Sequence, residues 1–388
     1  MSIFAKNASL RVLCIFLCMD LNFFDRILNM DSTSGREAEL ADYLSVELDA
    51  PGRKVDVFEV GDGSKNVLVS WGVPKVIFCT HLDTVPPYIA PTWKCTGTSA
   101  VSGASAVYGR GTCDAKGQIF AMYEACKELE EKGCDGFGLL LLAGEETGSF
   151  GAKAFNAMSL NGLLDEDCVL IVGEPTDNCM ASAAKGTKAF EVNFSGKAFH
   201  SGYPEYGISA VELFNDFMNA LRSIRFPHDP VLGETTWNIG RLSSDNPQNI
   251  LSDRLTCRVY FRTTFESDEM VSNIMRNIAG PDAKLRFGRP KAQDGSDVVG
   301  NDEALWQQLM TVKALGGDTP TRFETLEGFD VKPVSFGSDA PQLTCFRRKI
   351  LCGPGSILVA HRPDEHITLS VLETAKRNYI SMYDILHR

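Results

Sequence analysis

The sequence predicts an α/β protein with a central, mostly parallel sheet and a second, α+β domain inserted into it. Three short apolar runs bounded by turn residues are typical of buried parallel strands: VIFCT up to Thr80, LLLLA up to Ala143 and VLIV up to Val172. From residue 185 to 290 the elements instead follow the order β-α-β-β-α-β, the split βαβ or ferredoxin-like arrangement. A chain of 388 residues is long enough for two such domains.

The first domain is expected to comprise residues 19–184 and 291–388. Its first helix is an amphipathic segment that follows Asp20, and a later helical stripe runs from Ile119 to Leu129, with Gly133 as a stop. After the insertion, the domain is expected to resume with a helix at 302–315 and to close with a helix at 369–386.

The inserted domain is expected to comprise residues 185–290. Alternating apolar and polar residues predict strands, and a stretch rich in Leu and Phe predicts the first helix. The strands are expected at 188–195, 235–242, 255–264 and 285–288, and the helices at 208–226 and 268–278.

Side chains that can bind metal come directly after the three apolar runs. His81 follows the first run, Glu145 and Glu146 the second, and Glu174 the third, while Asp114 opens a helix. Because ligands bind at the carboxyl ends of parallel strands, these side chains are expected to converge in one crevice. One imidazole and four carboxylates would repel one another there. Two divalent cations would remove that repulsion, and zinc accepts both kinds of ligand atom.

Some of these residues also have an ordinary structural interpretation. Asp83 is expected to orient the imidazole of His81 by a hydrogen bond, but a solvated loop His beside an acidic turn explains this segment equally well. Asp114 could simply cap the helix that it opens. The adjacent pair Glu145 and Glu146 is harder to explain in this way, because a carboxylate that follows a buried strand is costly to desolvate. One of the two can bind metal while the other faces a water molecule.

Together and in this order, five segments resemble the dinuclear zinc aminoacylase and deacetylase superfamily, which includes acetylornithine deacetylase, succinyl-diaminopimelate desuccinylase and carboxypeptidase G. The segments are THLDTVP, GRGTCDAKG, GEE, VGEPT and the stretch from GPG to AHRPDEH. The resemblance runs from about Met19 to the C-terminus. It implies a zinc-exopeptidase-like first domain with two Zn²⁺ per chain, for which Co²⁺ can substitute. Thr80 and Gly144 depart from the pattern, since Gly commonly precedes the first ligand and Asp often precedes the Glu pair.

The resemblance also implies a role for each residue. The two metals would share one bridging carboxylate, and the two ligand sets would be His81, Asp114 and Glu174, and Asp114, Glu146 and His361. Spacing alone does not choose between His361 and His366 as the last ligand, whereas the resemblance selects His361. Glu145 would act as the base that takes a proton from water and delivers it to the leaving amine.

In dimeric relatives the inserted domain forms the dimer and acts as a lid, so a homodimer is expected. The resemblance matches His200 and Asn249 with residues that reach the partner's active site, where His200 would donate a hydrogen bond to the oxyanion. Taken alone, a single His in a turn is usually structural. Arg262 could pair with a substrate carboxylate or form a surface ion pair. Gly337 and Ser338 resemble residues of a substrate-contacting loop.

The expected function is a metal-dependent amidohydrolase that removes a small acyl group from an N-acyl amino acid, as acetylornithine deacetylase does. One alternative is a metallo-aminopeptidase or carboxypeptidase that acts on di- or tripeptides. Another is a non-catalytic binder that kept the fold. An intact Glu145 argues against the binder, because a binder has no use for an unligated base.

The composition of the chain excludes some kinds of binding partner and favours one cellular compartment. The net charge of −12 and the isoelectric point near 5.1 argue against nucleic acid, and no apolar stretch is long enough to predict a membrane span. The 12 cysteines are scattered without CxxC pairs, which favours the reduced cytoplasm. Residues 1–18 resemble a signal peptide without a cleavage site, and we expect them to be an extension before a truer start at Met19.

Overall fold

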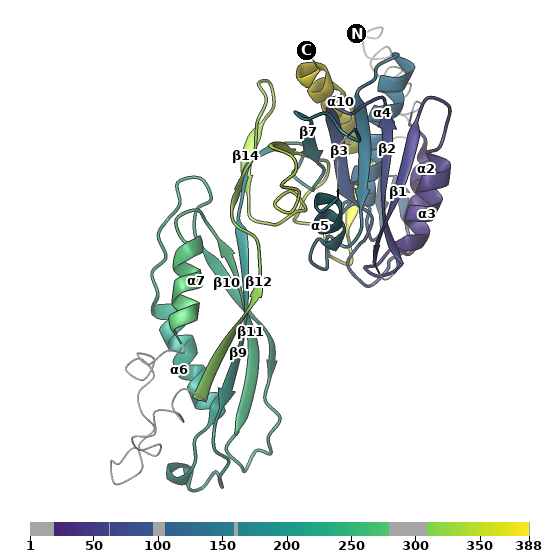
Figure 1. Ribbon diagram of the computed structural model, residues 1–388. Helices are drawn as coiled ribbons and strands as arrows, with labels where there is room; N and C mark the ends of the chain where they lie inside the picture. The colour runs from purple at the N-terminus through teal and green to yellow at the C-terminus, as the bar shows by residue number, and fades with distance from the viewer. Residues whose placement is uncertain (1–18, 62, 96–104, 159–161, 279–308, 388) are drawn as a thin grey trace, which may run out of the picture. The chain divides into compact units, whose positions relative to one another are not determined.

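The computed structural model describes residues 19–61, 63–95, 105–158, 162–278 and 309–387. Two compact units divide this chain (Figure 1). The first takes in the residues up to Ser182, together with Phe323–Lys332 and the residues from Ser338 onward, and the second consists of Ala183–Arg322 and Pro333–Gly337. The extension expected at residues 1–18 lies outside the described residues.

A six-stranded sheet of order β1-β2-β6-β3-β7-β15 forms the centre of the first unit. Strands β6, β3, β7 and β15 are parallel to one another, and β2 is antiparallel to both of its neighbours. The bounds are β1 Lys54–Gly61, β2 Ser64–Trp71, β3 Val76–His81, β6 Phe137–Leu142, β7 Val169–Val172 and β15 Arg348–Leu351. The predicted α/β class with a mostly parallel sheet is confirmed.

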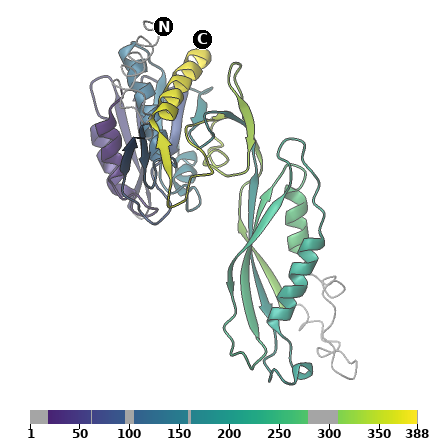
Figure 2. The ribbon, with the colours of Figure 1, turned by 180° about the vertical axis from the view of Figure 1, so that it is seen from behind.

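The three apolar runs are fully buried because helices and loops cover the sheet. Every residue of β3, β6 and β7 is buried, as expected for parallel strands. Helices α4 and α10 pack on each other and on β3, while α3 and α5 contact β1 and β2 (Figures 1 and 2). The helix bounds are α2 Leu21–Leu28, α3 Ala38–Glu47, α4 Lys116–Glu131, α5 Phe150–Asn156 and α10 Leu369–Leu386.

A small antiparallel sheet of order β16-β5-β4 completes the first unit. Its bounds are β4 Thr92–Cys95, β5 Ser105–Tyr108 and β16 His366–Thr368. This sheet positions the site, because β5 leads into the loop that carries Asp114, and β16 follows the segment that carries His361.

The second unit is an antiparallel sheet of order β10-β11-β9-β12, with α6 and α7 packed on β9 and β11. Its core includes Val192, Phe217 and Val259. The bounds are β9 Gly186–Ser195, η1 Pro204–Tyr206, α6 Ala210–Ser223, β10 Thr236–Ser243, β11 Arg254–Thr263, α7 Asp268–Asn277 and β12 Met310–Gly316. The chain order of these elements and their order in the sheet are those of the predicted ferredoxin-like arrangement.

The last strand of this sheet differs from the prediction. Residues 310–315, expected within a helix of the first domain at 302–315, belong to β12, which pairs antiparallel with β9. The second unit therefore continues past residue 290, the expected boundary, as far as Arg322. Met310 and Val312 alternate toward the core, and pairing with β9 outweighs the local helix propensity. The expected strand at 285–288 lies outside the described residues.

Three short strands lie where the chain passes between the units. They are β8 Met180–Ala184, β13 Thr321–Arg322 and β14 Val331–Val334, in the order β13-β8-β14. Within the described residues, no helix has the length and apolar character needed to cross a membrane.

Candidate metal centre

Strand register brings the predicted ligands to one edge of the central sheet. In the parallel pairing of β3 with β6, His81 lies opposite Leu142, so the glutamate pair follows just beyond that edge. In the pairing of β3 with β7, Cys79 lies opposite Val172, and Glu174 follows two residues later. Because these parallel strands end together, residues far apart in the chain become neighbours.

Asp114 lies between two imidazoles, in the turn that leads into α4. Its Oδ1 is 3.0 Å from Nε2 of His81, and its Oδ2 is 3.3 Å from Nε2 of His361. The residue is only 5% exposed. Each carboxylate oxygen therefore faces a different histidine, which is the arrangement that a bridging ligand needs.

Three groups of ligand atoms lie close enough together to hold a cation, each with its atoms within 4.8 Å of one another among the described residues. They are His81, Asp114 and Glu174; Asp114, Glu146 and His361; and His81, Glu145 and Glu146. The first two groups share only Asp114. The first is wholly buried, whereas the second is open on one side, since the His361 side chain is 46% exposed.

Asp83 organises both the first histidine and the glutamate pair. Nδ1 of His81 lies 2.9 Å from the main-chain carbonyl of Asp83, but 3.5 Å from its carboxylate. The carboxylate instead accepts hydrogen bonds from the backbone N–H groups of Glu145 at 3.0 Å and Glu146 at 3.2 Å, and from the hydroxyl of Ser34 at 2.8 Å. The residue expected to orient His81 through its side chain does so more closely through its carbonyl, because the turn that follows β3 brings that carbonyl back toward the ring.

The acidic groups of the cluster carry more negative charge than their surroundings neutralise. Burial, reinforced by neighbouring carboxylates, raises the pKa of both Glu145 and Glu174 well above the ordinary value. Hydrogen bonds to Asp114 and Glu146 raise the pKa of His361 to about 10. A buried group of oxygen and imidazole ligands with this excess of negative charge fits divalent cations.

The two departures from the family pattern each have a local reason. Gly144 has a φ of 70°, and a Cβ built on it would lie 1.7 Å from the ring of Phe150. An aspartate therefore has no room there beside Phe150. Thr80 uses its hydroxyl to donate a hydrogen bond to the carbonyl of Gly173 at 3.0 Å, which ties the end of β3 to the end of β7.

Of the two candidate histidines His361 and His366, only His361 lies in the cluster. His366 stacks on Tyr108 with ring centroids 4.7 Å apart, and its Nδ1 lies 2.8 Å from the carbonyl of Asp364. It belongs to none of the groups that could hold a metal. The choice that spacing left open is thus made by the fold.

In the second unit, His200 and Asn249 lie on two exposed loops that contact each other. His200 forms a bridge with Ile250, and the N–H of Ser201 donates to the carbonyl of Asn249 at 2.9 Å. Nδ1 of His200 accepts a hydrogen bond from the N–H of Gly202 at 3.1 Å. A neutral imidazole that accepts at Nδ1 carries its proton on Nε2, and this nitrogen is then a donor.

Two of the predicted substrate-binding residues also come together in the second unit. Arg262 is half-buried on β11, with its guanidinium 5.1 Å from the centroid of the Tyr260 ring. A Cβ built on Gly337 would lie 3.9 Å from a guanidinium nitrogen of Arg262. Ser338, the next residue, is buried, and its hydroxyl accepts a hydrogen bond from the N–H of Ala340 at 3.3 Å.

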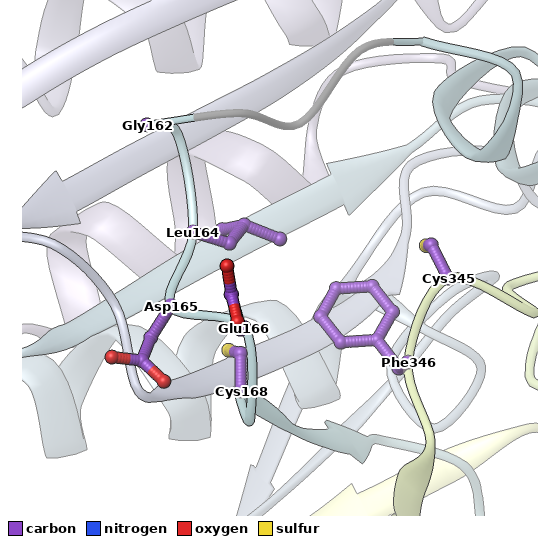
Figure 3. A pocket seen from close by; sticks show the side chains of 7 residues that line it. All are labelled: Gly162, Leu164, Asp165, Glu166, Cys168, Cys345 and Phe346. Carbon is purple, nitrogen blue, oxygen red and sulfur yellow. The ribbon is translucent and has the colours of Figure 1, made fainter.

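A pocket of about 490 Å³ lies elsewhere in the first unit, before the start of β7 (Figure 3). Its lining residues are Gly162, Leu164, Asp165, Glu166, Cys168, Cys345 and Phe346. The metal ligand Glu174 follows the other end of β7, and none of the lining residues belongs to a group that could hold a metal. The pocket is therefore separate from the candidate metal centre.

Sequence reasoning missed two residues that contact the predicted site. Ser34 donates to Asp83, and Glu365 accepts hydrogen bonds from the loop that carries Asp114. Ser34 stands in no motif, and nothing in the chain marks it. Glu365 does stand in the AHRPDEH segment, where a carboxylate close to the candidate ligand His361 was a signal that could have been followed.

The sequence is similar to known proteins over most of its length. A family model described as peptidase family M20/M25/M40 matches residues 77–383. A protein of Aspergillus flavus named Probable carboxypeptidase is 31% identical over 386 residues, which cover 92% of this chain and 85% of that protein.

Solved structures share the fold. A tripeptidase from Staphylococcus aureus superimposes with a TM-score of 0.72 at 20% identity, covering 94% of this chain and 97% of its own. A dinuclear metal-binding peptidase of the M20 family from Bacillus subtilis has a TM-score of 0.61 at 12% identity, covering 95% and 97%.

Proposed function

Because the chain belongs to peptidase family M20/M25/M40, we propose that it is a two-metal peptidase that removes the C-terminal residue from short peptides. Its membership makes it a metal-dependent hydrolase of amide bonds. The observation that carries the two-metal proposal is the position of Asp114, with one oxygen toward His81 and the other toward His361. The peptidase activity follows the names of its relatives, which are called carboxypeptidases and peptidases.

This proposal replaces the first expectation from the sequence. Removal of a small acyl group from an N-acyl amino acid, and with it a place in amino-acid biosynthesis, finds no support among these relatives. The peptidase alternative agrees with them better. Both reactions hydrolyse an amide bond with the same groups, so the residues of the metal centre do not distinguish them.

The proposed ligand sets are the two that share Asp114. His81 and Glu174 would complete one of them, and Glu146 and His361 the other. Zn²⁺ is the proposed cation, with Co²⁺ as a substitute, since imidazole nitrogen and carboxylate oxygen suit both. Two such cations supply Lewis acidity and make water nucleophilic near neutral pH.

Glu145 is the proposed base. The two sets that share Asp114 leave Glu145 without a cation, and its backbone N–H is held by Asp83 at 3.0 Å. The raised pKa of the Glu145 carboxyl suits a group that first accepts a proton from water and then gives it to the leaving amine. A non-catalytic binder would have no need for such a group beside the ligands.

The second unit is proposed to bring substrate-binding groups to a homodimer. The exposed loops that carry His200 and Asn249 would enter the partner's site, where Nε2–H of His200 would stabilise the oxyanion. Arg262 and the main chain at Gly337 would bind the terminal carboxylate of a peptide, which is the group that a carboxypeptidase must recognise. Ser338 would contact the substrate from the same loop. The buried free thiols suit a reducing compartment, and the cytoplasm is the proposed location.

Blocked dipeptides test this function directly. The purified protein is assayed with added Zn²⁺ or Co²⁺ on N-blocked dipeptides, on C-terminally amidated dipeptides and on N-acetyl amino acids. A carboxypeptidase releases the free C-terminal amino acid from the first and leaves the second intact. Cleavage of the amidated set alone would make it an aminopeptidase, and cleavage of N-acetyl amino acids alone would restore the deacylase.

A further inference from the structure

The side chain of Glu365 accepts several hydrogen bonds from the loop that carries Asp114. Its Oε1 accepts hydrogen bonds from the backbone N–H groups of Gly111 at 2.9 Å, Cys113 at 3.1 Å and Asp114 at 3.1 Å. Backbone N–H groups that converge in this way form a concave site for an anion. Here the protein fills that site with a carboxylate of its own, which is fully buried.

The second oxygen of Glu365 forms a buried ion pair. Oε2 lies 2.5 Å from Nη1 of Arg110, and the two side chains are 0% and 2% exposed. Arg110 also donates to the main-chain carbonyls of Pro87 and Arg362, each at 3.4 Å. A buried ion pair is costly to desolvate unless hydrogen bonds satisfy both groups. These hydrogen bonds go to the main chain, so the pair fixes backbone positions.

The residues around this ion pair also contact the segment that carries His361. The N–H of Gly109 donates to the carbonyl of Glu365 at 3.0 Å, and Arg110 reaches the carbonyl of Arg362. His361 has a φ of 63°, a conformation that costs a non-glycine residue free energy and persists only where the surroundings impose it. The hydrogen bonds at Arg362 and Glu365 anchor the segment that follows His361.

We propose that Glu365 is a positioning residue for the metal centre. By holding the loop Gly111–Asp114 against the segment from His361 to Glu365, it presets the bridging carboxylate between the two histidines before any cation binds. The inference rests on the proposed two-metal site, but it concerns a carboxylate that belongs to none of the candidate ligand groups. Presetting the ligands lowers the cost of ordering them and so strengthens metal binding.

A merely structural role for Glu365 makes a different prediction. In that case, its replacement lowers the stability of the fold and leaves the metal geometry of the folded protein unchanged. A positioning role changes the affinity for metal and the coordination geometry in protein that is still folded.

The first test compares two glutamate substitutions. Glu365→Gln keeps the shape of the side chain but removes its charge and its ion pair. We expect Zn²⁺ to bind about 10-fold or more weakly in competition with a chromophoric chelator, and the visible spectrum of the Co²⁺-loaded protein to change. The control, Glu130→Gln, breaks an Arg53–Glu130 ion pair of the same 2.5 Å length in the same unit. It should leave affinity and spectrum unchanged.

The second test uses the wild-type protein and does not depend on the variant folding. After chelation, hydrogen–deuterium exchange is followed in peptides that cover residues 109–116. We expect the loop to be protected already without metal, with little further protection when Zn²⁺ is added, because Glu365 and not the cation orders it.

Two outcomes would overturn the proposal. One is a loop that exchanges freely without metal and becomes protected only when metal binds. The other is folded Glu365→Gln with wild-type affinity and an unchanged cobalt spectrum. Wild-type protein that binds no metal would instead refute the proposed function, and the exchange experiment would still report on the loop.

Discussion

Three candidate ligands of the first unit are buried, whereas His200 and Asn249 of the second unit are exposed on loops. His81, Asp114 and Glu174 are at most 5% exposed, and the loop that carries Asp114 is held by hydrogen bonds to Glu365. In the second unit, backbone hydrogen bonds link the two exposed loops that carry His200 and Asn249, and the side chains of both residues are exposed.

The two units differ in the free-energy cost of keeping their candidate residues where they lie. Burial and neighbouring carboxylates raise the pKa of Glu145 and Glu174, and bound cations would offset the cost of keeping these carboxylates charged. An exposed histidine costs nothing to keep and demands no partner. The catalytic role proposed for His200 therefore depends on a partner surface, such as a second copy of the chain.

The largest effect is expected from the residue shared by both ligand sets. Asp114→Asn removes the charge that faces both His81 and His361, so both cations should be lost and hydrolysis should become undetectable. Elemental analysis of the purified variant measures this directly. Retention of two cations and of activity would show that Asp114 is not the bridge, and the contrast between the units would lose its basis.

Glu145→Gln should have the next largest effect, because it removes the proposed base without removing a ligand. We expect both cations to stay bound while kcat falls by about 10²- to 10⁴-fold. The matched variant is Glu146→Gln, one residue later, which should weaken metal binding at one site. If the two variants exchange these behaviours, the roles of the adjacent glutamates are reversed.

His200→Ala should reduce kcat by about 10²-fold and change substrate affinity less, since the hydrogen bond strengthens only as charge develops on the oxyanion. Metal content should not change. This result would sharpen the comparison, because an exposed residue of the second unit would then matter to chemistry in the first.

Mixing variants tests whether the site is shared between subunits. The impaired Glu145→Gln and His200→Ala proteins are combined under conditions of subunit exchange. Heterodimers should regain part of the activity, because one of their two sites combines an intact Glu145 with the partner's intact histidine. Proven heterodimers that stay inactive, or an active monomer, would leave His200 with a structural role.

The smallest effect is expected from the Arg53–Glu130 ion pair, a partly buried pair of the first unit outside the metal cluster. Hydrogen bonds from Arg53 and Trp71 lower the pKa of Glu130, and they outweigh the effect of burial, which raises it. Such a carboxyl contributes stability above its ordinary value of 4.5, and this stability is lost as the pH falls through the lowered value.

Glu130→Gln should therefore lower Tm by about a few degrees at pH 7, and the difference from wild type should narrow under acidic conditions. Thermal melts at several pH values measure it, and metal content is the control. A loss of metal would show that the cluster depends on charges well beyond its neighbours. A Tm difference between wild type and Glu130→Gln that grows as the pH falls would contradict the lowered pKa of Glu130.

The local sequence pattern was sufficient to predict the candidate ligands that follow buried parallel strands. The runs before His81, Gly144 and Gly173 predicted both the strands and the edge at which their ligands meet, because strand direction and burial leave few alternatives. It failed at residues 310–315, where a segment with helical character pairs with β9. Whether a segment forms an edge strand depends on pairing with a strand far away in the chain, here β9.

The sequence by itself determined the α/β class, the first five elements of the ferredoxin-like second unit and the kinds of residue that gather at the carboxyl edge of the sheet. These features follow from periodicity and residue chemistry, which are local. The family resemblance had already selected His361 over His366. Only the tertiary structure decided that Asp83 orients His81 through its carbonyl and that Glu365 holds the loop of Asp114. Each of these depends on a distance between segments that the fold alone brings together.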